Sequence, residues 1–169
     1  MKVSGGLMLS ILIITLFSCN LITRKEALLV NNTLVGINDT LYLKGKAFGL
    51  LVGDCYKAKN FSLLKQGRIE FEHYIDDSRA RVAKMKDVGG SEALRYCEIE
   101  LLDVEKRMIK KDFIPFEELT AESTLEQVNH HFDMVKNDSK DETAVLNKLR
   151  ALQADYAKKN GFTLIRKNE

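Results

Sequence analysis

Several residue types are scarce in this chain, and each scarcity narrows the fold and the chemistry. The 169 residues include one proline, Pro115, and no tryptophan. A β-sandwich or barrel needs many turns rich in proline and glycine, so a single proline argues against a loop-rich β architecture. The chain also has no large excess of charge of one sign, since it contains 26 basic and 24 acidic side chains. Nucleic-acid binding usually needs a strongly basic face, so no nucleic-acid partner is expected.

Motifs for catalysis are equally scarce. The sequence contains no Gly-x-Ser-x-Gly, no phosphate-binding glycine loop and no Cys-x-x-Cys, and it has only three histidines. Glu70 and His73 have the spacing found in di-iron helix bundles, but Glu126 and His130 stand four residues apart, not three. A di-iron site needs two pairs at three-residue spacing and two further glutamates. The sequence therefore predicts a protein that is not an enzyme and that holds no metal or cofactor.

The N-terminus carries the most specific signal. Lys2 precedes an apolar stretch, residues 7–17, which is interrupted only by Ser10 and Thr15. A helix that crosses a bilayer needs about 20 apolar residues, whereas this length suits the core of a signal peptide. The stretch ends in Leu16-Phe17-Ser18-Cys19. An aliphatic residue, a small residue and then a cysteine resemble the lipobox of bacterial lipoproteins. An ordinary secretory signal that happens to contain a cysteine is the alternative.

The resemblance is closest in type to the small surface lipoproteins of spirochaetes, especially the Lyme-disease group. It rests on the permissive lipobox of residues 16–19, followed by a lysine-rich chain without catalytic motifs. It implies cleavage after Ser18, a diacylglycerol thioether on Cys19, and usually acylation of the new amino group. It also implies a place on the cell surface, in contact with host or vector molecules. It identifies no ligand.

Apolar periodicity predicts helices through the rest of the chain. After Ser91, a stripe at alternating three- and four-residue spacing predicts one helix, which Pro115 should end: Leu94, Cys97, Leu101, Val104 and Met108. Ser123-Thr-Leu-Glu126 and Ser139-Lys-Asp-Glu142 both fit the capping box and predict the starts of two more helices. Asn160-Gly161 should end the last of them, with Phe162 folding back.

The upstream pattern is less regular. Two further helices are expected at about residues 40–60 and 62–86, and Asp87-Val-Gly-Gly90 is a clear break. Residues 20–38 look like an extended tether, although residues 28–30 and 34–35 could pair as a small hairpin across Asn31-Asn32. The sequence thus predicts a signal peptide at 1–18, a lipidated tether at 19–38, and an all-α antiparallel bundle of about five helices at 39–169.

Three sets of residues have both a structural and a functional interpretation. Cys55 and Cys97 could form a disulfide outside the cytoplasm, or stay reduced as small apolar residues. Gly45, Gly49 and Gly53 share one helix face, which either packs closely inside the bundle or docks a partner. The third set is basic and could bind sulfated glycans or anionic lipids, or could simply stabilise the C-terminus of a helix through its dipole: Lys106, Arg107, Lys110 and Lys111.

Two functions fit these observations. The first is a lipid-anchored, non-catalytic protein of the outer surface that binds a protein or glycan of the host, vector or envelope. The second is a lipoprotein on the periplasmic face that acts as a scaffold or assembly factor. In both, Cys19 attaches the chain to a membrane.

Overall fold

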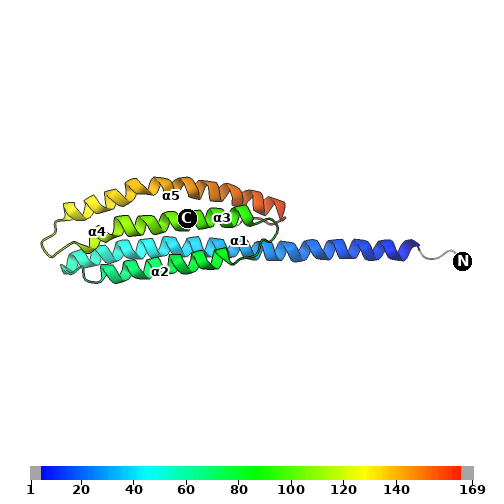
Figure 1. The fold of residues 1–169 in the computed structure, drawn as a ribbon, viewed down its shortest axis with the longest axis horizontal. Coiled ribbons are helices and arrows are strands. Elements are labelled where there is room, and N and C mark those ends of the chain that lie inside the picture. The colour runs from blue at the N-terminus through cyan, green and yellow to red at the C-terminus, as the bar shows by residue number, and fades with distance from the viewer. Residues whose placement is uncertain (1–4, 165–169) are drawn as a thin grey trace.

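The chain folds as a bundle of four long antiparallel helices, with no strand among the residues that the structure describes (Figure 1). The computed structural model describes the backbone of residues 5–164 and the side chains of residues 23–164. The first two helices are α1 (Gly5–Ala58) and α2 (Leu64–Ala83). The third combines α3 (Glu92–Met108), the π-helical η1 (Ile109–Phe113) and α4 (Ile114–Glu117), and the fourth is α5 (Leu125–Lys159). The all-α class is confirmed, but the count of five helices is not.

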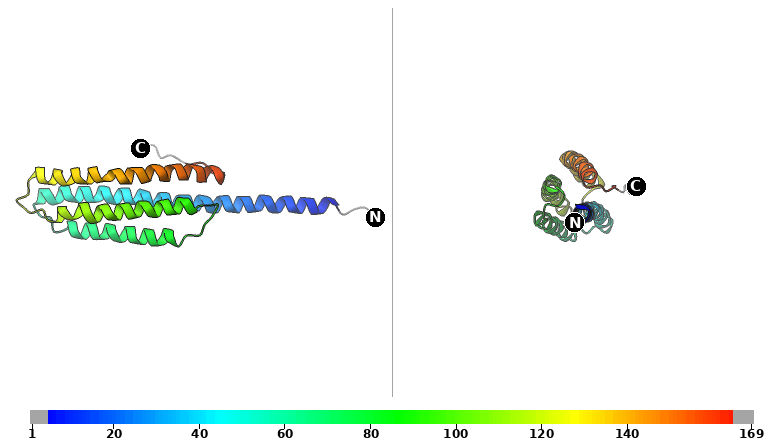
Figure 2. Two further views of the ribbon diagram at one scale, coloured as in Figure 1. Left: turned by 45° about the horizontal axis from the view of Figure 1, so that its top comes forward. Right: turned by 90° about the vertical axis from the view of Figure 1, so that its right-hand side faces the viewer.

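The expected tether is wrong, because residues 20–38 belong to α1. Ala27, Leu34 and Ile37 are buried, at 0%, 2% and 0% exposure, and they pack in the same core as the rest of the bundle. The hairpin across Asn31-Asn32 does not form either, since both asparagines lie within the helix. Beyond the bundle, α1 continues alone toward the N-terminus (Figures 1 and 2). A helix rises 1.5 Å per residue, so Cys19 stands only about 12 Å along the axis from Ala27.

Pro115 does not end the third helix as the sequence predicted. A proline inside an α-helix lacks an amide hydrogen and clashes with the carbonyl four residues earlier. Here η1, a π-helical segment, directly precedes Pro115, which stands in the first turn of α4. The first turn tolerates proline because its amides have no helical acceptor. The wider turn therefore lets the chain continue to Glu117 in the same direction (Figure 1).

The last two predicted helices are one helix, α5. Its N-cap is Thr124, whose side chain accepts a hydrogen bond from the Gln127 amide, while the Gln127 side chain accepts one from the Thr124 amide. The capping box is thus real but starts one residue later than expected. Ser139 caps nothing, because its hydroxyl donates to the Lys136 carbonyl inside the helix at 2.8 Å. Gly161, at φ 68°, ends the helix, and Phe162 packs on Tyr156, both as predicted.

Hydrogen bonds between polar side chains join the helices at defined positions along the bundle axis. The Gln153 amide of α5 donates to Asn31 of α1 at 2.9 Å. Asn38, seven residues further along α1, donates to the buried carboxylate of Glu98 in α3 at 3.1 Å. Apolar contacts fill the spaces between, and near η1 the rings of Phe48 and Phe113 stack with 4.3 Å between centroids. These contacts fix the vertical register of α1 against its neighbours.

Candidate functional site

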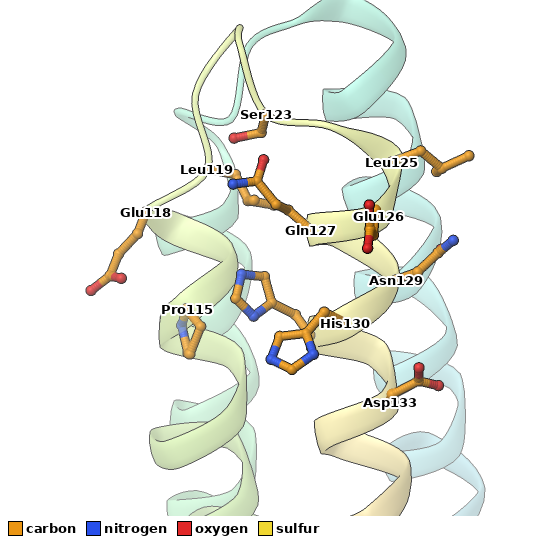
Figure 3. Close-up of a pocket in the computed structure, with 11 residues that line it drawn as sticks. Pro115, Glu118, Leu119, Ser123, Leu125, Glu126, Gln127, Asn129, His130 and Asp133 are labelled. Atoms are coloured by element: carbon orange, nitrogen blue, oxygen red, sulfur yellow. The ribbon is translucent and has the colours of Figure 1, made fainter.

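An open groove lies between α4 and the start of α5 (Figure 3). These two segments stand at the end of the bundle opposite the N-terminal extension of α1 (Figure 1). Its volume is about 860 Å³, which falls within the usual range for ligand pockets. One wall comes from α4 and the residues that follow it, and the other from the first turns of α5. The lining residues are Pro115, Glu118, Leu119, Ser123, Leu125, Glu126, Gln127, Asn129, His130, His131 and Asp133.

Local hydrogen bonds shape the loop between the two walls. The Ser123 hydroxyl accepts a hydrogen bond from the Thr120 amide at 2.9 Å, and Leu119 is buried in the core. The capping box of Thr124 then sets the direction in which α5 departs. The groove is consequently held by a turn and a helix start, and its walls are anchored to the bundle on both sides.

Carboxylates give the groove an acidic character. Glu118, Glu126 and Asp133 line it, and no lysine or arginine is among its lining residues in the described part of the chain. In Figure 3 the Glu118 and Glu126 side chains come from opposite walls, and Glu118 extends outward, away from α5. Such a surface attracts cationic groups and accepts hydrogen bonds from them.

The two histidines stand side by side on α5, with ring centroids 6.0 Å apart. Burial lowers the pKa of His131, and the neighbouring His130 lowers it further, while Glu118 acts in the opposite direction. Its Nδ1 atom is buried without a hydrogen-bond partner, and Phe116 packs against the ring with 5.3 Å between centroids. His131 is therefore uncharged at neutral pH. The chemistry that these groups offer is recognition by hydrogen bonding and charge.

Sequence reasoning missed this groove. It considered His130 with Glu126 as a poor metal pair and Glu126 as part of a capping box, and it assigned no role to Glu118 or His131. The groove depends on α4, which the sequence did not predict, since Pro115 was expected to stop the helix. The one local signal was the capping box, which does mark the start of the α5 wall.

The predicted basic patch is divided among different partners. Lys106 forms an ion pair with Asp76 of α2, and Lys111 forms one with Asp138 of α5. Arg107 and Lys110 are exposed, and Arg107 lines a second, shallower groove of about 700 Å³ between α3 and α5. Two of the four residues are therefore paired with acidic side chains of other helices, and two are exposed.

Of the two alternatives for Cys55 and Cys97, the structure shows the second: no disulfide forms, and both cysteines are buried and free. Cys97 lies close in height to Asn38, because its neighbour Glu98 accepts a hydrogen bond from Asn38. Cys55 lies 17 residues beyond Asn38 on α1, which corresponds to about 25 Å along the helix. A disulfide needs Cα atoms within about 7 Å, so this register excludes the bridge. The thiols behave as small apolar side chains, and burial raises the pKa of each.

The glycine face of α1 is largely unpacked. A Cβ atom at Gly45 would lie 3.9 Å from Phe71, but at Gly49 and Gly53 it would meet nothing within 4 Å. Close packing inside the bundle therefore does not explain Gly49 and Gly53. Their face of α1 is open to solvent or to a partner.

Replacing Gly49 or Gly53 by alanine should stabilise the protein. Each substitution is expected to raise the free energy of unfolding by about 0.5–1 kcal/mol, because alanine restricts the unfolded chain and favours the helix. Gly67→Ala is the matched control: its Cβ would lie 2.9 Å from Leu51, which must move. Urea denaturation followed by circular dichroism measures the three effects. A loss of stability in Gly49→Ala would show that the face is occupied.

Comparisons with known proteins leave the family open. No family model matches the chain. Searches of curated proteins and of solved structures likewise find no match. Among the described residues, no helix combines the length and apolar character needed to cross a membrane. The side chain of Cys19, the expected attachment point of the lipid, lies outside the side chains that the structure describes.

Proposed function

We propose that this protein is a non-catalytic lipoprotein, anchored through lipid on Cys19, that presents a helical bundle on the outer surface of a bacterial cell. The observation that carries the proposal is the course of α1. This helix runs without interruption from Gly5, through the lipobox residues, into the core of the bundle. The anchor residue and the bundle therefore share one helix, and the acidic groove lies at the opposite end (Figure 1).

This arrangement would make the groove the most accessible recognition surface. Two or three acyl chains on Cys19 would hold the protein firmly, since one chain alone gives only marginal binding. With the membrane at the N-terminal end of α1, the loop between α4 and α5 would point away from it. The acidic lining of Glu118, Glu126 and Asp133 favours a partner that presents lysine or arginine side chains. A basic segment of a host, vector or envelope protein has that chemistry.

Fractionation of cells that carry Cys19→Ala tests the anchor. The wild-type chain should be found with the membrane in its cleaved form, and the variant should lack lipid and keep residues 1–18. Asn20→Ala, which leaves the lipobox residues 16–19 intact, is the control and should behave as the wild type. Equal cleavage and equal membrane retention of the Cys19→Ala variant would contradict the proposal.

Protease treatment of intact cells tests surface display. The α4–α5 loop, with Thr120, Ala121 and Glu122 exposed, is the expected site of first cleavage. Cleavage there in intact cells places the bundle on the outer surface. Protection until the outer membrane is opened would place it on the periplasmic side and sink the surface assignment.

A further inference from the structure

The end of the bundle nearest the anchor is formed by three segments that the fold brings together. The loop between α2 and α3 lies against the end of α5, because the Tyr156 hydroxyl donates to the Val88 carbonyl at 2.9 Å. Asn160 also donates to the Gly89 carbonyl at 3.2 Å. Near Gly90 the Lys159 amine lies so close that an added Cβ would stand 2.2 Å from it. The loop and the end of α5 therefore form one surface.

Near Arg24, α1 lies at the same level along the bundle axis as this surface. Asn31 of α1 is hydrogen-bonded to Gln153 of α5, and the two helices are antiparallel (Figure 1). Seven residues further toward this end, α1 reaches Arg24 and α5 reaches Asn160. Both steps are about 10 Å, so Arg24 stands level with the end of α5. Three elements thus contribute side chains to one end of the molecule.

Basic side chains predominate on this surface. We use the term basic collar for six exposed residues: Arg24, Lys25, Lys84, Lys86, Lys158 and Lys159. The exposed acidic residues at this end are Glu26, Asp87, Glu92 and Asp155. Asp87 is engaged within the loop, where its carboxylate accepts hydrogen bonds from the Ser91 hydroxyl and the Glu92 amide. The collar therefore has a net positive charge, in contrast to the acidic groove at the other end.

We infer that the basic collar seats the bundle on anionic phospholipid headgroups, so that the acidic groove is held outward from the membrane. This inference rests on the proposed anchor at Cys19. Arg24 is five residues from Cys19, or about 8 Å along the helix, which is close to the screening length at physiological ionic strength. Basic residues near a lipid anchor add electrostatic attraction to an anionic surface. An extended tether would not impose this proximity, whereas a continuous helix does.

Lysine acetylation of the full lipidated chain in vesicles tests whether the basic collar rests on anionic headgroups. This contact is called the seat below. The chain is reconstituted into phosphatidylcholine vesicles and into vesicles that contain phosphatidylglycerol, and acetylation at each lysine is followed by mass spectrometry. Near an anionic surface the local proton concentration rises, which lowers the reactive, unprotonated amine fraction about threefold. Lys84, Lys86, Lys158 and Lys159 should react that much more slowly in the anionic vesicles. Lys57 and Lys65, exposed near the groove end, should react equally in both.

Two variants sharpen the test. Lys84→Glu with Lys86→Glu should restore the reaction rates of Lys158 and Lys159 in anionic vesicles to their values in neutral ones. Lys57→Glu with Lys65→Glu makes the same charge change at the other end and should alter nothing. Raising the ionic strength to about 1 M, where the screening length is near 3 Å, should abolish the protection in the wild type.

The outcomes separate the seat from the anchor. If the chain floats with both kinds of vesicle and the collar lysines react equally in both, the seat is wrong while the anchor stands. If the chain floats with neither, the anchor is wrong and the seat fails with it. Flotation with both, and protection confined to the anionic vesicles, supports the inference.

Discussion

Ile37→Ala is expected to lower the free energy of unfolding by about 2–5 kcal/mol, the usual cost of truncating a buried isoleucine. Ile37 has 0% exposure and lies in the part of α1 that the sequence suggested was a tether. Truncation leaves a cavity between α1 and its neighbours that the bundle closes only in part. Chemical denaturation of the purified full-length chain, followed by far-ultraviolet circular dichroism, measures the change.

Leu29→Ala provides the control from the same segment. Leu29 is 66% exposed, so its truncation should change the free energy of unfolding by less than about 0.5 kcal/mol. A tether would make both substitutions neutral, because neither side chain would be packed. Equal small effects of Ile37→Ala and Leu29→Ala would therefore contradict the helical course of α1 through residues 27–37.

Stability is expected to fall as the pH rises from about 5 to about 8. Glu105 of α3 lies beside Glu142 of α5, and burial together with this neighbour raises its pKa from 4.5 to about 8. Glu98 is fully buried, which raises its pKa to about 7, although the hydrogen bond from Asn38 opposes the shift. Between pH 4.5 and these values the folded chain keeps protons that the unfolded chain releases. Unfolding is therefore favoured as the pH rises, and the slope disappears above about pH 8.

Glu105→Gln should remove much of this dependence. Glutamine resembles the protonated carboxyl, so the variant should be more stable than the wild type at pH 8, by an amount on the order of a few kcal/mol. At pH 4.5 the two should be nearly equal. Glu92→Gln, at an exposed position, is the matched control and should leave the profile unchanged. Free energies of unfolding measured from pH 4.5 to pH 9 would contradict the account if the wild type gained stability with pH.

A second carboxyl pair, between the third helix and α5, should also make the stability fall as the pH rises. Asp112 of η1 is buried, and this burial, together with Asp138 of α5, raises its pKa. Asp138 itself accepts a hydrogen bond from Lys111, which lowers its own pKa. Because only the pKa of Asp112 is raised, Asp112 takes up a proton before Asp138 as the pH falls. Both pairs join the third helix to α5, so a rise in pH should weaken that interface first.

Local patterns predicted the elements best where a helix has one uninterrupted apolar stripe. Leu94, Cys97, Leu101 and Val104 are buried in α3 as expected, since three- and four-residue spacing gives a single face whatever the partner. The Asn160-Gly161 stop also holds, because a left-handed residue at a helix end is a local requirement. These features need no knowledge of the remaining chain.

The errors arose where the deciding partner is distant in sequence. Asn31 suggested a turn, but its side chain accepts a hydrogen bond from Gln153, and Asn38 donates one to Glu98. No local pattern reveals either partner. The apolar residues between them, including Leu34 and Ile37, have the spacing of a buried helix face. Polar residues on that face made it look like a tether, and only the tertiary contacts show that these side chains have hydrogen-bond partners on other helices.

Local sequence patterns could not predict the groove or the carboxyl pairs, for the same reason. Glu98, Glu105 and Asp112 recur every seven residues, a spacing that places them along one side of the third helix. That spacing was a usable signal for buried carboxyls, but the partners Glu142 and Asp138 come from α5. The groove requires the helix to continue through Pro115, which depends on the π-helical segment before it.

The most direct test of the proposed anchor is the mass of the N-terminal peptide of the protein isolated from the membrane fraction. The account predicts a mature chain that begins at Cys19 and carries a diacylglycerol thioether, with an acylated amino group in most molecules. A chain that begins at another residue, or an unmodified Cys19, would contradict it. Either result would also remove the physical basis for placing the basic collar at the membrane.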